Sequence, residues 1–497
     1  MPQPLRLYNT LTRTIEPFRP IEAGKVSLYV CGMTVYDRPH VGHGRAFVVF
    51  DAFVRYLRHR GWDVRFVRNF TDVDDKIIAR ANERGEDPLA LAQGFIDVFH
   101  EDMRALGLID PDVEPRVTLC IPQIIDLVQS LVDKGHAYAS EGTVWFAVET
   151  CEGYGKLSGQ DPDKLRNPDE LAGKRAPGDF ALWKAAKPGE PSWESPWGPG
   201  RPGWHIECSA MSRTELGETF DIHGGGLDLV FPHHENEIAQ SECGNGAPYA
   251  NYWMHNGLLT APGGQKMGKS LGNVIDLSDA LAQYPAEAIR LYYLQNQYRS
   301  PLPWSGSALD DALAMLARLY GALEVARTFG GDGDADRVAQ EMGKPALTVL
   351  TLGRAFPEAM YAALDQDFNT ALVLGHAFEL ARAVNRFSNL KKAKKRGAPV
   401  IAPALAAFDL LAKALGVLSA SPDAFHAEVI DKRLAVLGVD PAEVERLIAE
   451  RSEARAARDW ARADGIRDAL TAMHIEVMDR PDGVDWRVRL TPVEDDQ

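Results

Sequence analysis

The chain has 497 residues, of which 45% are hydrophobic and 25% charged, a composition typical of a globular protein with about two to four domains. We expect a cytoplasmic protein without a membrane partner, because no apolar run approaches the roughly 18 to 20 residues of a membrane span and the N-terminus lacks the features of a signal peptide. The 54 Lys and Arg residues against 70 Asp and Glu residues give a net charge of −16, which disfavours nucleic-acid binding unless basic residues gather on one face.

The first predicted elements form a βαβ unit. An apolar strand at Val26–Cys31 leads into a glycine-rich turn, an amphipathic helix follows at about Ala46–Arg60, and a second strand is predicted at Val64–Asn69. This spacing is typical of two parallel strands joined by a right-handed crossover. A strand, a glycine-rich turn and a helix together indicate a nucleotide site.

The next stretch predicts an inserted subdomain. Apolar residues at helical spacing cover Ile121–Lys134, and a strand-like run follows at Thr143–Val148. From about Gly153 to Gly203 the chain is rich in Gly, Pro, Lys and Trp. Because so many Gly and Pro residues disfavour regular elements, we expect this part to end in an ordered but irregular loop.

The α/β pattern then returns and gives way to helices. A strand at Thr219–His223, a helix at Pro232–Cys243 and a strand at Tyr252–His255 are predicted. Helical periodicity dominates from about Leu277 to Leu418, which predicts a helical bundle. The remaining Asp440–Gln497 segment predicts a charged helix pair and a short β-like tail.

We therefore predict an α/β Rossmann-type catalytic domain with an inserted subdomain, then an all-α bundle and a small α+β C-terminal domain. The expected boundaries are 1–120 with 203–276 for the catalytic domain, 121–202 for the insert, 277–420 for the bundle, and 421–497 for the last domain. A basic segment at Lys391–Arg396 interrupts the bundle; a solvated loop is the favoured explanation, and a basic patch is the alternative.

Two motifs fit a nucleotide triphosphate. His40 and His43 frame the residues HVGH, where Gly42, the helix N-terminus and imidazole N–H groups can stabilise charge on a phosphate. Lys266 and Lys269 lie three apart in the glycine-studded loop Ala261–Asn273, which can close over phosphates. A capping turn with incidental histidines and a solvated basic loop are the alternatives.

A third motif fits a metal. His233 and Glu237 are four apart on one helical face, while His234 and Glu237, three apart, are a second option. With Cys31 and Cys208 they would complete a tetrahedral zinc set. The five cysteines are odd in number and widely spaced, which favours a reduced compartment, and buried structural cysteines remain the alternative.

An aspartate follows the glycine run Gly224–Gly226. Asp228 lies where open α/β sheets bind ligands, so it suits ribose hydroxyls, although a turn or cap aspartate has the same pattern.

In combination these motifs resemble the class I aminoacyl-tRNA synthetases, and the four prospective metal ligands resemble the cysteinyl-tRNA synthetases specifically. The segments YVCGMTVYD, VRNFTDVDDKI, FPHHENEIAQSE and ARDWARADGIRDAL match that family, so the resemblance covers essentially the whole chain. It implies activation of L-cysteine by ATP with Mg²⁺, followed by transfer to tRNA(Cys), and we expect a monomer. It also implies roles for the following residues: Cys31, Cys208, His233 and Glu237 as Zn²⁺ ligands, His40 and His43 at the HIGH positions, Lys266 and Lys269 as the KMSKS lysines, Gly32, Thr71, Trp204 and His205 in the cysteine pocket, and Asp228 on the ribose of ATP.

The sequence departs from the family pattern in three places. Gly268 replaces the serine of the lysine motif, Met33 replaces a usual proline, and Leu119 with Cys120 interrupts the pattern after Thr118. None removes a group that the chemistry needs. Two rival functions are a cysteine:amino-sugar ligase of mycothiol synthesis and a non-catalytic zinc and RNA-binding module.

Overall fold

A four-stranded parallel sheet is the centre of the catalytic part of the chain. In this computed structural model, which describes residues 4–165, 173–261, 263–265, 267, 274–480 and 483–490, the sheet has the strand order β10-β9-β3-β4. These strands extend the four that the sequence predicts: β3 (Lys25–Thr34), β4 (Asp63–Thr71), β9 (Phe220–Gly226) and β10 (Ala250–Asn256). Apolar residues on both faces bury the strands between two layers of helices.

The order of these strands creates a switch point between β3 and β9. The chain runs from β3 to β4 on one side and from β9 to β10 on the other, while β3 and β9 pair in parallel at the centre. Helix α1 (Val41–His59) contacts β4, β9 and β10, and α5 (Trp204–Leu216) contacts β3 and β4. The fold is therefore of the Rossmann type, and ligands are expected at the carboxyl ends of β3 and β9.

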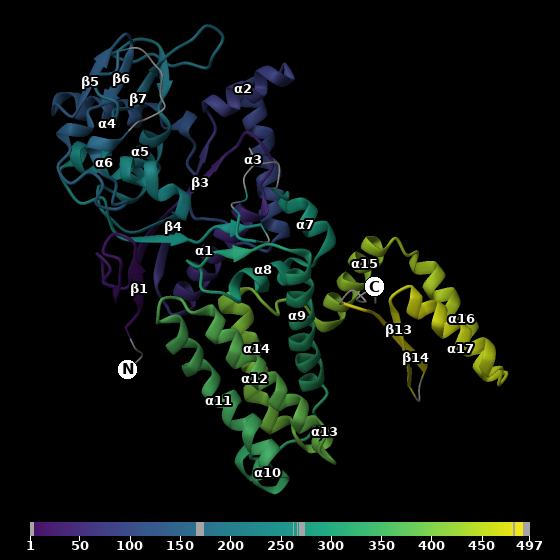
Figure 1. The fold of residues 1–497 in the computed structure, drawn as a ribbon. Helices are drawn as coiled ribbons and strands as arrows, with labels where there is room; N and C mark the ends of the chain where they lie inside the picture. Colours follow the sequence, from purple (N-terminus) through teal and green to yellow (C-terminus); the bar gives the residue numbers. More distant parts are fainter. Residues whose placement is uncertain are drawn as a thin grey trace.

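The inserted part contains an antiparallel sheet, seen at the upper left of Figure 1. Its strands follow the order β5-β6-β7-β8, with bounds β5 (Ala137–Ser140), β6 (Thr143–Phe146), β7 (Phe180–Ala185) and β8 (Gly200–Pro202). The expectation of an irregular loop up to Gly203 was therefore wrong for β7 and β8. Pro202 is tolerated because β8 is an edge strand, where one side of the backbone needs no partner.

A helical bundle extends from the catalytic part, at the bottom of Figure 1. Its helices are α7 (Leu277–Gln283), α8 (Ala286–Leu294), α9 (Gly306–Arg327), α10 (Ala335–Met342), α11 (Lys344–Leu364), α12 (Thr370–Ser388), α13 (Ala393–Arg396) and α14 (Ala398–Leu415). The basic segment thus includes a one-turn helix, α13, rather than only a loop. Contrary to the expectation from the sequence, α14 is long and apolar enough to cross a membrane by length and composition. It packs against α11 and α1, which explains that composition as a bundle core.

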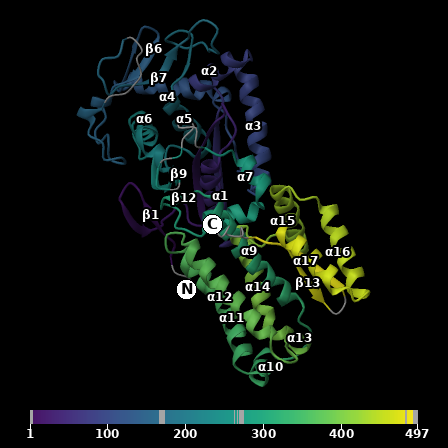
Figure 2. The same cartoon turned by 45° about the vertical axis from the view of Figure 1, so that its right-hand side comes forward.

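The C-terminal elements form a small unit beside the bundle (Figure 2). They are α15 (Pro422–Leu437), α16 (Pro441–Ala456), α17 (Trp460–Ala472) and the antiparallel pair β13 (Ile475–Arg480) and β14 (Gly483–Val488). Leu434, Val444 and Leu470 belong to a core of their own. Because α15 contacts α7, α9 and β14, it joins the bundle to this unit, and the exact boundary between them stays a prediction.

The remaining elements flank the sheets. They are β1 (Arg6–Asn9), β2 (Thr14–Pro17), α2 (Asp75–Arg84), α3 (Pro88–Ala105), α4 (Ile121–Asp133), α6 (Glu235–Asn245), β11 (Leu259–Thr260), β12 (Leu302–Pro303) and short turns η1 (Val117–Leu119), η2 (Val148–Thr150), η3 (Pro162–Lys164), η4 (Leu227–Leu229) and η5 (Val230–His234).

Candidate active site and metal centre

Four metal-ligating side chains meet at the carboxyl end of β3. Cys31 comes from β3, Cys208 from α5, His233 from η5 and Glu237 from the first turn of α6. Glu237 Oε1 lies 2.9 Å from His233 Nε2 and 3.4 Å from Cys31 Sγ, and the two sulfurs are 3.7 Å apart. All four residues are buried, and one ligand atom from each lies within 4.8 Å of the others. The fold thus brings together the four residues that the sequence nominated.

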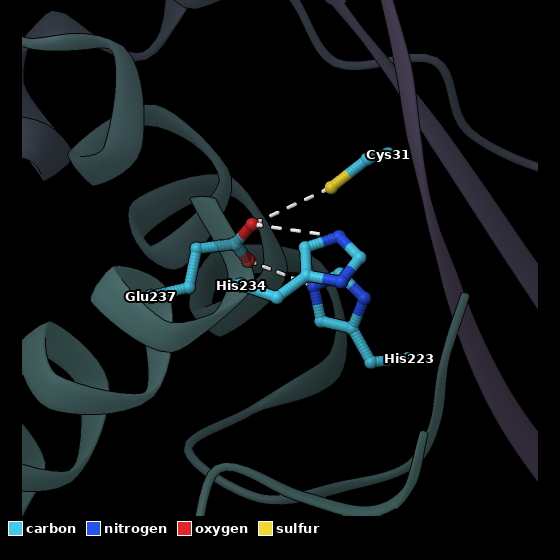
Figure 3. A group of neighbouring side chains, drawn as sticks. All are labelled: Cys31, His223, His234 and Glu237. Atoms are coloured by element: carbon cyan, nitrogen blue, oxygen red, sulfur yellow. Dashed lines mark hydrogen bonds and ion pairs between the residues drawn. The ribbon is translucent and has the colours of Figure 1, made fainter. Parts of the chain in front are cut away.

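A second set of donors shares Cys31 and Glu237. As Figure 3 shows, His223 from β9 and His234 from η5 point at the same carboxylate. His223 Nε2 donates to Glu237 Oε2 at 2.7 Å, whereas His234 Nε2 lies 4.0 Å from Oε1 and His234 Nδ1 lies 2.8 Å from His255 Nε2. His233 is therefore closer to Glu237 than His234 is, while His223 is a partner that the sequence did not predict.

The electrostatics of the first set fit a cation. Burial opposes ionisation of His233, but the Glu237 carboxylate and Cys208 raise the pKa of its imidazole to about 10. Burial also disfavours charge on Glu237, yet His223 and His233 hold the pKa of that carboxyl well below its usual range. Two thiols, an imidazole and a carboxylate in a dry pocket form a donor set that suits Zn²⁺. The residues present therefore fit the metal.

A cavity of about 560 Å³ opens above this cluster, at the switch point. Cys31 and Trp204 connect the two, because both line the cavity and the Trp204 ring stacks on His233 with centroids 4.3 Å apart. Other lining residues include Gly32, Thr34, Lys76, His40, Gly42, His43, Gly226, Asp228, Asn256 and Met267. The cavity is large enough for an aminoacyl-nucleotide.

The two histidines of HVGH cap the start of α1. His40 Nδ1 accepts hydrogen bonds from the backbone N–H groups of Gly42 at 3.1 Å and His43 at 3.3 Å, and His43 Nδ1 accepts from the His40 N–H at 3.2 Å. Their rings stack with centroids 3.7 Å apart. The capping turn is therefore also the turn at which the sequence predicts a phosphate site, since the cap engages the Nδ1 atoms while both histidines line the cavity.

The residues predicted for the cysteine pocket divide into two groups. Gly32 and Trp204 line the cavity. Thr71 and His205 lie behind it, where Thr71 Oγ1 donates to Glu207 Oε2 at 2.8 Å and His205 Nδ1 lies 3.1 Å from His233 Nδ1. A side chain is excluded at Gly32, because a Cβ there would lie 1.6 Å from the Asn69 carbonyl oxygen.

The predicted nucleotide residues are placed only in part. Asp228, in η4, lines the cavity near Gly226. Lys266 and Lys269 lie outside the described residues, as does Gly268. Met267, between the two lysines, lines the cavity.

Comparisons with known proteins agree with this geometry. Residues 17–314 match the family profile of the class I (C) tRNA synthetase catalytic domain, residues 359–419 a DALR domain, and residues 441–487 the cysteinyl-tRNA ligase anticodon binding domain. The chain is 49% identical to the cysteine–tRNA ligase of Geobacter metallireducens over 491 residues, covering 98% of this chain and all of the relative. The chain belongs to the cysteine–tRNA ligase family.

Other relatives and solved structures support this membership. The cysteine–tRNA ligase of Halorhodospira halophila is 50% identical over 490 residues, covering 97% of this chain and 99% of that protein. Methionyl-tRNA synthetase of Mycobacterium tuberculosis, solved with methionyl-adenylate, superposes with a TM-score of 0.59 at 16% identity, covering 84% of this chain and 95% of the other. At that identity the superposition establishes the class I synthetase fold alone.

Within this cysteine–tRNA ligase fold, Arg45 joins the HVGH helix to the segment that precedes the lysine loop. The guanidinium, from α1, donates to the carbonyl oxygens of Gly257 at 2.8 Å, Leu258 at 3.0 Å and Tyr298 at 3.2 Å. Arg45 is buried, and its burial lowers the pKa of the guanidinium to about 10. Backbone carbonyls thus hold a buried cation between the HVGH helix and the segment that enters the lysine loop.

Two further residues of the site carry no motif in the sequence. Asn256, at the end of β10, lines the cavity, and both polar atoms of its amide are buried without a hydrogen-bond partner among the described residues. Asn69, on β4, accepts a hydrogen bond from the Gly32 N–H at 2.9 Å and lies 3.7 Å from Cys208 Sγ. For each of these two asparagines, the only signal in the sequence was its place at or just after the end of a predicted strand.

Proposed function

We propose that this chain activates L-cysteine with ATP to form cysteinyl-adenylate and transfers the cysteinyl group to the 3′-terminal adenosine of tRNA(Cys). The observation that carries the proposal is the position of the Cys31, Cys208, His233 and Glu237 cluster directly below a nucleotide-sized cavity. Activation of cysteine requires one group that binds the substrate thiol and another that binds the phosphates of ATP. The metal-ligating cluster suits the first, and the cavity at the start of α1 suits the second.

In the first step the carboxylate of cysteine attacks the α-phosphorus of ATP, so that one P–O bond forms and the bond to pyrophosphate breaks. His40 and His43 hold the phosphates at the positive end of α1. Asp228 accepts hydrogen bonds from the ribose hydroxyls. We assign neutralisation of the pyrophosphate to Lys266 and Lys269 together with the Mg²⁺ that accompanies ATP.

In the second step a ribose hydroxyl of the terminal adenosine attacks the acyl carbon, and AMP leaves. This step needs positioning more than covalent catalysis. The C-terminal unit, with its own core, is suited to holding the distant end of the tRNA. Free cysteines at all five positions support a reducing, cytoplasmic setting.

We assign selection of the substrate thiol to Cys31, Cys208, His233 and Glu237 as ligands of one Zn²⁺. Bound there, zinc would supply a soft Lewis acid for which the thiolate of cysteine is a far better ligand than the hydroxyl of serine. The Trp204 ring stacks on His233 and also lines the cavity, so it would lie beside the bound amino acid. Discrimination on the order of 10⁴ could then arise without an editing site.

The proposal is tested by cysteine-dependent pyrophosphate exchange and by charging of tRNA(Cys) with the full chain, in its zinc form and after chelation. We expect both activities in the zinc form and a much smaller preference for cysteine over serine in folded, metal-free protein. An unchanged preference would refute the role of zinc. Ligation of cysteine to an amino sugar in place of tRNA charging would favour the mycothiol alternative, and absence of pyrophosphate exchange would favour a non-catalytic module.

A further inference from the structure

Two cysteines outside the metal cluster lie side by side. Cys151 follows η2 in the inserted part and Cys243 lies in the last turn of α6, 92 residues later, yet their sulfurs are only 3.1 Å apart. Both side chains are partly exposed, unlike the buried Cys31, Cys208 and Cys120. The pair is therefore accessible to a small reagent from solvent.

The elements that carry the two thiols are already tied together. The carboxylate of Glu235, in the first turn of α6, accepts hydrogen bonds from the N–H groups of Gly155 at 2.9 Å and Ser158 at 2.7 Å. The Tyr154 hydroxyl also donates to Asn236. These contacts hold the segment after Cys151 against α6, so the two sulfurs can meet without a large movement of either element.

A metal site is a poorer explanation of this pair. Among the described residues, the groups of three or more possible ligands all contain Cys31 and Glu237, and none contains Cys151 or Cys243. In the described part of the chain the two thiols belong to no group of three ligand atoms within 4.8 Å of one another, whereas a zinc site uses four donors. Chemistry between the two sulfurs themselves is the better explanation.

The surroundings favour the thiolate of Cys243. The hydrogen bond between the two sulfurs lowers the pKa of the Cys243 thiol, and the ammonium groups of Lys156 and Lys134 contribute in the same direction, against burial and Glu242. Because the thiolate is the form that attacks a disulfide, Cys243 is the better nucleophile of the pair.

We propose that Cys151 and Cys243 form a reversible disulfide by exchange with a low-molecular-weight disulfide. The Cys243 thiolate attacks one sulfur of the small disulfide, a mixed disulfide forms, and a small thiolate leaves. Cys151, after loss of its proton, attacks the Cys243 sulfur and releases the second small thiol. The protein loses two electrons and two protons, and the small disulfide is reduced to two thiols.

The location of the bond gives it a specific effect. Glu237 lies in the same helix, six residues before Cys243, so the bond would attach α6 covalently to the inserted part near the metal cluster. It would do so without oxidising Cys31 or Cys208. Closing a loop of 92 residues also stabilises the folded state relative to the unfolded chain.

The test equilibrates the full-length zinc protein with mixtures of glutathione and glutathione disulfide, traps free thiols with iodoacetamide under denaturing conditions, and maps non-reduced peptides by mass spectrometry. Zinc content and Tm are measured on the same samples. Variants Cys151→Ser and Cys243→Ser remove the pair, and Cys120→Ser is a matched control that keeps it.

We expect a peptide that links Cys151 to Cys243 in the wild type and in Cys120→Ser, with zinc retained and a Tm several degrees higher that dithiothreitol reverses. The two pair variants should show neither the link nor the shift. Alkylation of both cysteines at every ratio tested, or stable glutathione adducts on each without a link between them, would overturn the proposal. So would loss of zinc in parallel with formation of the link.

Discussion

Replacement of Glu237 by Gln tests whether the buried carboxylate organises the metal cluster. Oε1 lies 2.9 Å from His233 Nε2, and Oε2 accepts hydrogen bonds from His223 Nε2 at 2.7 Å and the Tyr249 hydroxyl at 2.9 Å. Both oxygens therefore face donors. Glutamine has the same shape but no charge, and its NH₂ group must face one of these donors.

The expected loss of stability in Glu237→Gln follows from the burial of the Glu237 carboxylate. Neutralising one partner of a buried, hydrogen-bonded ion pair costs about 3 to 5 kcal/mol, because the other charge is left without compensation. Glu237 is fully buried and His233 is 2% exposed, so solvent does not reduce this cost. We expect Glu237→Gln to lower the free energy of unfolding by about 3 kcal/mol or more.

The assay is urea unfolding followed by tryptophan fluorescence in the presence of a chelator, so that a loss of metal is not counted. Bound zinc is measured separately, and the variant should retain much less of it. The matched control is Glu242→Gln on the same helix, whose carboxylate pairs with Lys156 and is partly exposed, so that it should cost about 1 kcal/mol or less. Equal stability of the two variants, with full zinc in both, would show that Glu237 does not organise the cluster.

Three further predictions concern Asp102, Asn256 and Gly32. Burial raises the pKa of Asp102 to about 6, so the folded state binds this proton more tightly than the unfolded chain, and the stability of the protein falls as pH rises from about 4 to 6. Asp102→Asn should therefore raise the free energy of unfolding by about 1 to 3 kcal/mol at pH 8 and by almost nothing below pH 4. An equal gain at both pH values in thermal melts would contradict this. Asn256→Leu should raise the KM for ATP in pyrophosphate exchange about tenfold or more, because a hydrogen bond to a ligand contributes about 1.5 kcal/mol. The same substitution should not lower the Tm of the free protein. An unchanged KM would show that Asn256 does not contact the nucleotide. Gly32→Ala should destabilise the protein by about 2 kcal/mol or more, because the added Cβ clashes with the Asn69 backbone. The control is Gly94→Ala in the middle of α3, where an added Cβ has no neighbour within 4 Å. That variant should be neutral or stabilising in the same urea titration.

The regular elements of the catalytic part were predictable because their residues follow local rules. Val26 to Cys31 is largely apolar, and Val64 to Asn69 carries Val64, Phe66 and Val67 between polar residues; the structure extends each strand by a few residues. The prediction was wrong where a tertiary contact overrides local preference. Gly200–Pro202 forms an edge strand because its neighbour β7 supplies the hydrogen bonds, which no property of the Gly- and Pro-rich stretch reveals.

The sequence alone offered the four metal-ligating residues as one option, and only the family resemblance selected that set. Cys31 and Cys208 are 177 residues apart, and no spacing rule relates them. The pair at i and i+4, His233 and Glu237, was visible locally, and its side chains do meet. His223 escaped prediction because it lies inside an apolar strand, where a histidine on a buried face carries no signal of the carboxylate it contacts.

The buried Arg45 links the position of the HVGH helix to the position of the segment that precedes the lysine loop. Its side chain lies between the first helix turn after HVGH and the Gly257 to Leu258 segment, so neither can shift without altering the hydrogen bonds of the other. The start of α1 and the Gly257 to Leu258 segment are therefore mechanically linked through one guanidinium group. Because Val41, Gly257 and Leu258 line the cavity, a substitution at Arg45 would alter the cavity from two sides, although Arg45 itself is not among its lining residues.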